Sequence, residues 1–184
     1  MSSGLQHVIL RPALVFGKHD PTDRLYYWLY QVKMKNFLLL PENGKRIFST
    51  TYVADLVETI ILSLKSDARA ETYNVISNPK TCIKQIIDLA SQAIKKDGTI
   101  VNASADFLKR NDIAQWTDMP LWINGDHFTY SNQKLKKELN IEMTDFEIAI
   151  KKTIEHYNHL NWHKPKYGMT EATRQELINK LKTI

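Results

Sequence analysis

Glycine is scarce in this sequence, and its few glycines are scattered. The 184 residues contain six, at positions 4, 17, 44, 98, 125 and 168, and no two of them lie within ten residues of each other. A pyrophosphate-binding loop needs clustered glycines, because backbone N–H groups must approach the phosphates without a Cβ in the way. The sequence therefore excludes a Gly-rich dinucleotide-binding loop and a P-loop within these residues.

Cysteine and long apolar runs are also scarce. Cys82 is the single cysteine, so an internal disulfide is excluded and a reducing cytoplasm is the simplest compartment. The longest apolar stretches, such as residues 37–40, are far shorter than the ~20 residues that a membrane span requires. Residues 1–7 have no basic region followed by an apolar core, so we expect neither a secretory signal nor a membrane partner.

The net charge of +5 raises the question of an acidic partner such as nucleic acid. The basic residues, however, are spread along predicted helices and alternate with acids, as where Lys136 and Lys137 are followed by Glu138. This pattern is typical of solvated helix faces. We therefore do not expect a nucleic-acid partner.

Strands and helices are predicted to alternate along the chain. Residues 8–11 indicate a parallel strand buried on both faces, and residues 72–76 a second long strand. Residues 53–64 give the clearest helix, with one continuous apolar stripe that should face the core: Val53, Leu56, Val57, Ile60, Ile61 and Leu64. Further helices are expected near residues 23–34, 83–94, 132–139, 144–160 and 170–181, with one or two helical turns at 105–110 and short strands near 37–40, 46–50 and 99–101.

This alternation favours an α/β fold with some parallel pairing. Two long buried strands are too few for a doubly wound sheet. We therefore expect one domain over residues 1–184, with an incomplete parallel sheet and about six helices. Thr144 and Glu147 read as a capping box, Thr170 as the cap of the last helix and Asp55 as a cap in the first turn of its helix.

Two patterns that can carry chemistry are weak. Tyr130 and Lys134 have the Tyr-x-x-x-Lys spacing, but roughly 0.8 such matches are expected by chance, and this one opens a Lys-rich helix. The three histidines at positions 156, 159 and 163 could line one helix face and bind zinc, but they also fit an ordinary polar helix end. We predict no catalytic residue and no metal site in this chain.

Two segments resemble extended short-chain dehydrogenases/reductases of the NAD(P)-dependent epimerase/dehydratase type. Residues 8–17 (VILRPALVFG) are similar to the strand and loop that follow the catalytic Tyr-Lys helix in that family, and residues 48–57 (FSTTYVADLV) to the phrase that opens a long helix. A narrower resemblance, to a bacterial subgroup of predicted reductases, covers nearly the whole chain. It is carried by residues 20–28 (DPTDRLYYW), by Phe107-Leu108, Trp116 and residues 119–122 (MPLW), and by residues 168–177.

The resemblance implies the C-terminal, substrate-binding portion of a Rossmann-type enzyme, without the half that holds the nucleotide loop and the catalytic Tyr and Lys. In that family the loop after the first strand passes beside the nicotinamide, and the matching positions here are Pro12, Ala13, Leu14 and Val15. Ligands of open α/β sheets also bind beyond the carboxyl ends of the strands. Plain core packing is the alternative for these four residues.

Two departures from the family bear on the substrate. Nucleotide-sugar epimerases usually have an Asn where this chain has Leu14, and an Arg, which would clamp a diphosphate, where it has Phe48. Arg46 could partly substitute for that Arg, but a small carbonyl or sugar-like substrate fits better. The predicted substrate-binding residues are Arg24, Tyr27, Trp28, Arg46 and Trp122, although the aromatic ones could equally be core and Arg24 could merely pair with an acid.

The sequence thus predicts the substrate-binding portion of an NAD(P)-dependent reductase or epimerase that is inactive alone. NAD or NADP is expected in the complete enzyme, and no cofactor for this chain by itself. The expected partners are a small-molecule substrate and either the N-terminal half or a second copy, joined through open strand edges. Two alternatives remain: a non-catalytic binding module, including one for RNA, and the truncated product of a split gene.

Overall fold

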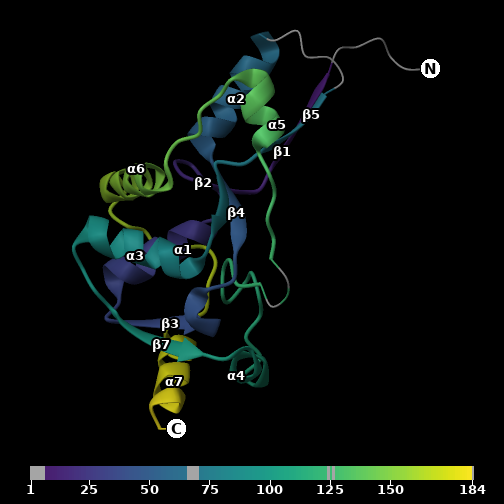
Figure 1. Ribbon diagram of the computed structural model, residues 1–184. Coiled ribbons are helices and arrows are strands. Elements are labelled where there is room, and N and C mark those ends of the chain that lie inside the picture. The colour runs from purple at the N-terminus through teal and green to yellow at the C-terminus, as the bar shows by residue number, and fades with distance from the viewer. Residues whose placement is uncertain (1–6, 66–70, 124, 126, 184) are drawn as a thin grey trace.

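The structure is a computed structural model, and it describes residues 7–65, 71–123, 125 and 127–183. The described residues form an α/β fold of seven α-helices and three small sheets (Figure 1). The strands are β1 (Val8–Pro12), β2 (Leu14–Phe16), β3 (Phe37–Pro41), β4 (Phe48–Tyr52), β5 (Glu71–Val75), β6 (Asn78–Thr81) and β7 (Thr99–Ala103). The helices are α1 (Arg24–Met34), α2 (Val53–Lys65), α3 (Ile83–Ile94), α4 (Ala105–Arg110), α5 (Gln133–Leu139), α6 (Phe146–His159) and α7 (Glu171–Lys182), with a 3-10 turn, η1, at Glu42–Gly44.

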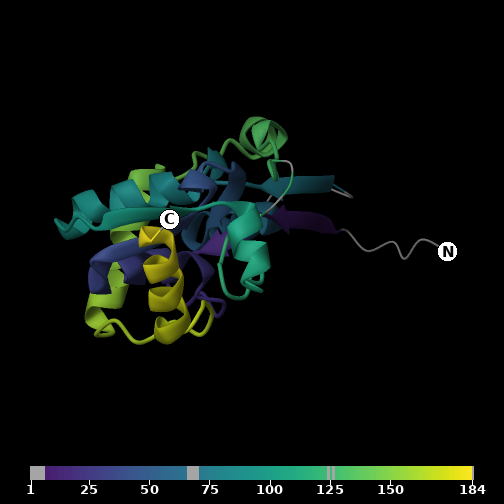
Figure 2. The same ribbon diagram turned by 90° about the horizontal axis from the view of Figure 1, so that it is seen from below.

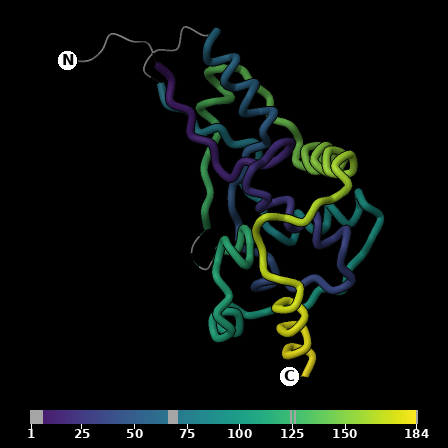
Figure 3. The backbone as a smooth tube through the Cα atoms, turned by 180° about the vertical axis from the view of Figure 1, so that it is seen from behind, coloured from purple at the N-terminus to yellow at the C-terminus, as the bar shows by residue number. Residues whose placement is uncertain are grey.

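The sheets are small and mostly parallel. β1 pairs with β5 and β3 with β7, both in parallel, while β4 lies between parallel β2 and antiparallel β6. The larger hydrophobic core joins α1, α3, α6 and α7 to β3 and β4, and a smaller core lies between the β1–β5 pair and helices α2 and α5. Figures 1 and 3 show β1 and β5 at one end of the molecule and α7 at the other, and Figure 2 shows the molecule from the α7 end. The predicted α/β class with incomplete sheets is confirmed.

The sequence predicts that β1 is buried on both faces, but the structure shows one face exposed. Val8 and Leu10 pack on the smaller core, whereas Ile9 is 45% exposed and Arg11 is also exposed. The strands at residues 8–12 and 71–75 pair with each other in parallel. Within the described residues β1 has β5 as its single neighbour, so its second edge is open.

Most of the predicted apolar stripe of α2 is exposed: only Val53 and Leu56 pack on the cores. Asp55, Thr59 and Ser63 are buried, whereas Val57, Ile60, Ile61 and Leu64 are 50%, 42%, 45% and 82% exposed. The buried hydroxyls are satisfied within the helix, because Thr59 donates to the carbonyl of Asp55 at 2.7 Å and Ser63 to that of Thr59 at 2.7 Å. This local bonding makes burial of the polar face inexpensive and leaves an apolar face exposed.

The capping predictions for Thr144 and Asp55 are both wrong, because these two residues bond each other. Asp145, and not Thr144, caps α6, since its carboxylate accepts from the backbone N–H groups of Glu147 and Ile148 at 2.9 and 3.3 Å. Thr144 instead donates its hydroxyl to the buried carboxylate of Asp55 at 2.6 Å, and its N–H bonds the same carboxylate. Asp55 is therefore a tie between α2 and the segment before α6. Thr170 caps α7 as predicted, accepting from the backbone N–H of Thr173 at 3.1 Å.

The chain changes sheet at Ala13, and this step creates the walls of the candidate site. β1 ends at Pro12, and after one residue β2 begins in the second sheet, where Leu14 pairs with Thr50. The Thr51 hydroxyl accepts from the N–H of Ala13 at 2.9 Å and donates to the carbonyl of Val75 at 2.5 Å. Residues 12–15, read from the sequence as a loop, are therefore a strand end, a crossing and the start of another strand.

Among the described residues, none of the helices combines the length and apolar composition needed to cross a bilayer.

Candidate functional site

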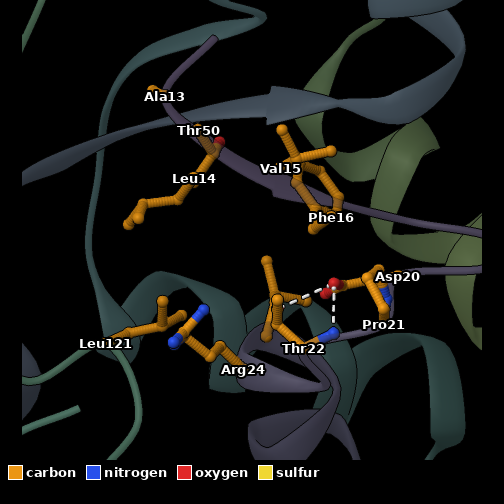
Figure 4. A pocket seen from close by; sticks show the side chains of 11 residues that line it. Ala13, Leu14, Val15, Phe16, Asp20, Pro21, Thr22, Arg24, Thr50 and Leu121 are labelled. Carbon is orange, nitrogen blue, oxygen red and sulfur yellow. Dashed lines mark hydrogen bonds between the residues drawn. The ribbon is translucent and has the colours of Figure 1, made fainter.

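A cavity of about 310 Å³ lies between β2 and the start of α1 (Figure 4). Its walls are mainly aliphatic and aromatic, with four polar residues among them. The lining residues are Ala13, Leu14, Val15, Phe16, Asp20, Pro21, Thr22, Arg24, Leu25, Thr50 and Leu121. This volume is at the lower end of the range of about 300–1,000 Å³ that is usual for small-molecule pockets.

Arg24, the first residue of α1, supplies a cation to this cavity. Its guanidinium carbon lies over the ring of Trp116 at 5.6 Å and over that of Tyr167 at 5.2 Å. Its buried Nε has no hydrogen-bond partner, and Arg24 donates to no acceptor in the part of the chain that the structure describes. Figure 4 shows the guanidinium on the side of the cavity opposite Leu14 and Thr50.

The two aromatic rings are held in place by bonds between distant segments. Asp23, which is 2% exposed, accepts from the backbone N–H of Lys166 at 3.2 Å, and this bond ties the segment before Tyr167 to the start of α1. The N–H of Gly168 donates to the carbonyl of Thr117 at 2.8 Å, which joins the segment after Tyr167 to the one after Trp116. The segments that carry the two rings are therefore tied to each other and to the start of α1.

Two further polar groups in the cavity lack partners. Asp20 accepts through Oδ1 from the N–H and the hydroxyl of Thr22 at 2.8 and 2.7 Å, but its Oδ2 has no partner, and neither has the buried hydroxyl of Thr50. Burial raises the pKa of the Asp20 carboxyl, against the lowering effect of the bonds from Thr22. Buried polar atoms are normally bonded, so unpartnered atoms around one cavity are typical of a site that receives a ligand.

A second hollow lies on the other side of the crossing, at the carboxyl ends of β1 and β5. It has a volume of about 490 Å³ and is lined by Arg11, Pro12, Ala13, Leu14, Asn74, Phe128 and Tyr130. Ligands of parallel sheets bind at such strand ends. The rings of Phe128 and Tyr130 meet edge to face at 5.1 Å, and both side chains are exposed.

The structure places the predicted cofactor-binding residues around these two spaces. Pro12 lines the second hollow, Val15 lines the cavity, and Ala13 and Leu14 line both. Arg24, which the sequence predicts to bind substrate, lines the cavity. Five residues that also line these spaces are absent from the predicted site: Asp20, Thr50, Asn74, Phe128 and Tyr130. The first four read as ordinary turn or strand residues, and Tyr130 stands out in the sequence only through its Tyr-x-x-x-Lys spacing with Lys134.

The other predicted substrate-binding residues do not line the cavity. Tyr27 and Trp28 are 4% and 1% exposed, and the Trp28 indole donates to the carbonyl of Pro120 at 2.8 Å. Trp122 is 2% exposed and donates to Glu42 at 3.1 Å. Arg46 bonds the same carboxylate at 3.1 Å and the carbonyl of Gly125 at 2.9 Å.

Glu42 thus lies between the indole of Trp122 and the guanidinium of Arg46. Burial acts to raise the pKa of the Glu42 carboxyl, but the hydrogen bonds from Arg46 and Trp122 outweigh it and lower the pKa. Phe48 is fully buried. The cavity therefore has one guanidinium, that of Arg24, among its lining residues.

The two weak chemical patterns are not assembled. Tyr130 precedes α5, while Lys134 on α5 pairs with Glu71 at 2.5 Å and lies over the ring of Tyr73. In the described part of the chain, no group of three or more His, Cys, Asp or Glu side chains is placed to hold a metal ion.

The sequence profile of the NAD dependent epimerase/dehydratase family matches residues 1–75. No curated protein matches the chain. Among solved structures, the UDP-glucose 4-epimerase of Thermotoga maritima, solved with UDP-glucose, is similar with 18% identity and a TM-score of 0.67, over 87% of this chain and 48% of that one.

Two further solved structures are similar to nearly the same extent. The UDP-glucose 4-epimerase of Thermus thermophilus, in complex with NAD, has 20% identity and a TM-score of 0.63, over 84% of this chain and 47% of that one. The dTDP-glucose 4,6-dehydratase of Bacillus anthracis, also with NAD, has 16% identity and a TM-score of 0.64, over 84% and 46%. This chain thus spans about half the length of these enzymes and shares their fold over that span. The family match includes every residue lining the cavity except Leu121. The residues around the cavity are therefore similar in sequence to those of NAD-dependent epimerases and dehydratases, which are extended short-chain dehydrogenases/reductases.

Proposed function

We propose that this chain is the substrate-binding portion of an NAD(P)-dependent epimerase, dehydratase or reductase acting on a small carbonyl or sugar-like substrate. The observation that carries the proposal is the cavity between β2 and α1. Apart from Leu121 its lining lies within the family match, and it shares Ala13 and Leu14 with the hollow at the carboxyl ends of β1 and β5. Ala13 and Leu14 line both spaces, and in this proposal a substrate in the cavity and a nicotinamide in the hollow meet beside these two residues.

The described residues fit one end of a dinucleotide. The hollow at the ends of β1 and β5 has room for a nicotinamide ring, which supplies hydride chemistry when bound, and its walls combine apolar and aromatic side chains with Arg11 and Asn74. The six scattered glycines offer no cradle for a pyrophosphate. We propose that Pro12, Ala13 and Leu14 form the wall beside the nicotinamide and that the pyrophosphate is held by another polypeptide segment.

The partner we propose is a dinucleotide-binding portion that continues the β1–β5 sheet. β1 has an open edge among the described strands, and α2 exposes Val57, Ile60, Ile61 and Leu64 beside it. A contiguous apolar patch of this kind usually marks an interface. The similar solved chains are about twice as long as this one, which favours a folded portion of comparable size as the occupant over a second copy. The partner would also bring the acid/base group, while this chain binds and orients the substrate and excludes water.

The experiment is reconstitution. The purified chain is assayed for NAD(P)H oxidation with small aldehydes, ketones and oxo acids, alone and with the dinucleotide-binding polypeptide that associates with it in its native cells. We expect oxidation in the mixture, and its loss when Leu64→Lys breaks the association. Robust oxidation by the chain alone would refute the division of labour, and tight homodimerisation through α2 would refute the choice of partner.

A further inference from the structure

We propose that the cavity between β2 and α1 binds a small hydroxy acid, with its carboxylate on the Arg24 guanidinium and its hydroxyl on Asp20. This inference rests on the proposed function and names its substrate class. It depends on three observations: a cation without an acceptor, an acidic oxygen without a donor, and walls that are otherwise largely apolar.

The guanidinium of Arg24 has no acceptor among the described residues, and an oxyanion would supply one. A guanidinium carries five N–H donors, and leaving a buried donor unbonded costs free energy. Arg24 has no acceptor in the described part of the chain, and its buried Nε is unpartnered. The rings of Trp116 and Tyr167 cover the guanidinium, so its N–H edge is the part left for a ligand. A planar carboxylate matches that edge with two parallel hydrogen bonds.

The charge balance favours a carboxylate over a phosphate. The lining residues include one cation, Arg24, and one acid, Asp20. A monoanion adds a single charge to this neutral pair, whereas a phosphate at neutral pH adds nearly two. Arg46 cannot assist from its present position, because it bonds Glu42 and the carbonyl of Gly125. The cavity therefore has too few hydrogen-bond donors to bind a diphosphate, which needs several.

Asp20 and the apolar walls determine the rest of the ligand. Oδ2 of Asp20 is an acceptor without a donor, and a ligand hydroxyl supplies one. The aliphatic side chains of Leu14, Leu25 and Leu121 suit a short branched carbon chain. A hydroxy acid is also the reduced partner of an oxo acid, and the two differ by the hydride and the proton that nicotinamide chemistry exchanges.

The test is binding to the chain alone, without cofactor or partner. 2-Hydroxyisocaproate is titrated by calorimetry and by tryptophan fluorescence, since Trp116 lies against Arg24. We expect saturable binding, weakened about tenfold or more in the neutral amide of the same acid and in isocaproate, which lacks the hydroxyl, because each loses one charged or donated hydrogen bond. Equal affinity for the amide, or the absence of saturable binding, overturns the proposal, and tighter binding of inorganic phosphate overturns the choice of carboxylate.

Two variants link the binding to this cavity. Arg24→Gln should weaken the acid about tenfold or more, while Arg46→Gln, which removes a guanidinium outside the cavity, should leave the affinity within about twofold. If Arg24→Gln melts at a lower temperature, Leu14→Trp fills the cavity from the opposite wall and must also abolish binding. Retained binding in both variants overturns the proposal. Acid binding without any hydride transfer in the reconstituted mixture would refute the proposed function and leave this inference standing.

Discussion

The buried polar face of α2 leads to a prediction that opposes ordinary expectation for an amphipathic helix. Asp55→Ala should destabilise the chain strongly, whereas Ile60→Gln on the apolar face should not. Asp55 is 2% exposed, and its carboxylate accepts from the hydroxyl of Thr144 at 2.6 Å and from the Thr144 N–H at 3.2 Å. The tie joins positions 89 residues apart.

The magnitude follows from the two donors that lose their acceptor. Hydrogen bonds to a charged group contribute about 1.5–3 kcal/mol each. Because Thr144 is only partly buried, water replaces some of this, and we expect a loss of about 3 kcal/mol in the free energy of unfolding. For a chain of this size that corresponds to a fall in Tm of roughly 6–12 °C. Ile60, at 42% exposure, should tolerate Gln within about 0.5 kcal/mol.

The assay is thermal unfolding of the purified variants at a concentration where sedimentation shows monomers. Monomers are required because an association that covers the α2 face would itself raise the apparent stability. If Ile60→Gln lowers Tm as much as Asp55→Ala, the apolar stripe faces the core and the orientation of α2 described above is wrong. The same result would remove the surface proposed to receive the dinucleotide-binding portion.

Three further predictions concern the segments around the site. Gly168→Ala should destabilise the chain by about 1–3 kcal/mol in urea unfolding, because φ is +109° there and a Cβ would lie 2.1 Å from a ring carbon of Tyr27. Trp28→Phe should cost about 1–3 kcal/mol in the same assay, since it leaves a buried carbonyl acceptor unbonded. The pKa of Glu171 is lowered to about 2, first by the hydrogen bond from Arg174, so its contribution is present above pH 4.5 and is lost as the pH falls from 4.5 towards 2. Glu171→Gln should flatten the dependence of Tm on pH in that window. An unchanged slope would show that Glu171 is not the group responsible for this loss of stability.

Local patterns predicted the elements well, but not the face that α2 buries. The periodicity of residues 83–94 predicted both the helix and its buried Ile86 and Ala90, because one core covers that helix. The same reasoning was wrong for α2, since its hydroxyls bond their own helix and the Asp55 carboxylate finds Thr144, a partner 89 residues away. Periodicity describes which residues share a face, and only the tertiary structure decides which face is covered.

The candidate site was predictable in part for a similar reason. A resemblance in sequence located residues 12–15 and Arg24 at the cavity and the adjoining hollow, because strand ends and helix starts keep their place when a fold is shared. It could not distinguish Tyr27 and Trp28, which are buried outside the cavity, from residues that line it, since an aromatic side chain suits either role. The sequence does not single out Thr50, because threonine is an ordinary residue in a β-strand.

The crossing at Ala13 connects the proposed functions of the chain physically. The Thr51 hydroxyl on β4 holds the N–H of Ala13 and the carbonyl of Val75, so one side chain fixes the end of β1, the start of β2 and the end of β5. Ala13 and Leu14 are walls of both the cavity and the hollow at the strand ends. In the proposed complex, a partner strand laid along the open edge of β1 would therefore set the position of the residues beside which substrate and cofactor meet. Assembly and substrate orientation would then depend on the same short backbone segment, so the proposed partner would supply geometry as well as chemistry.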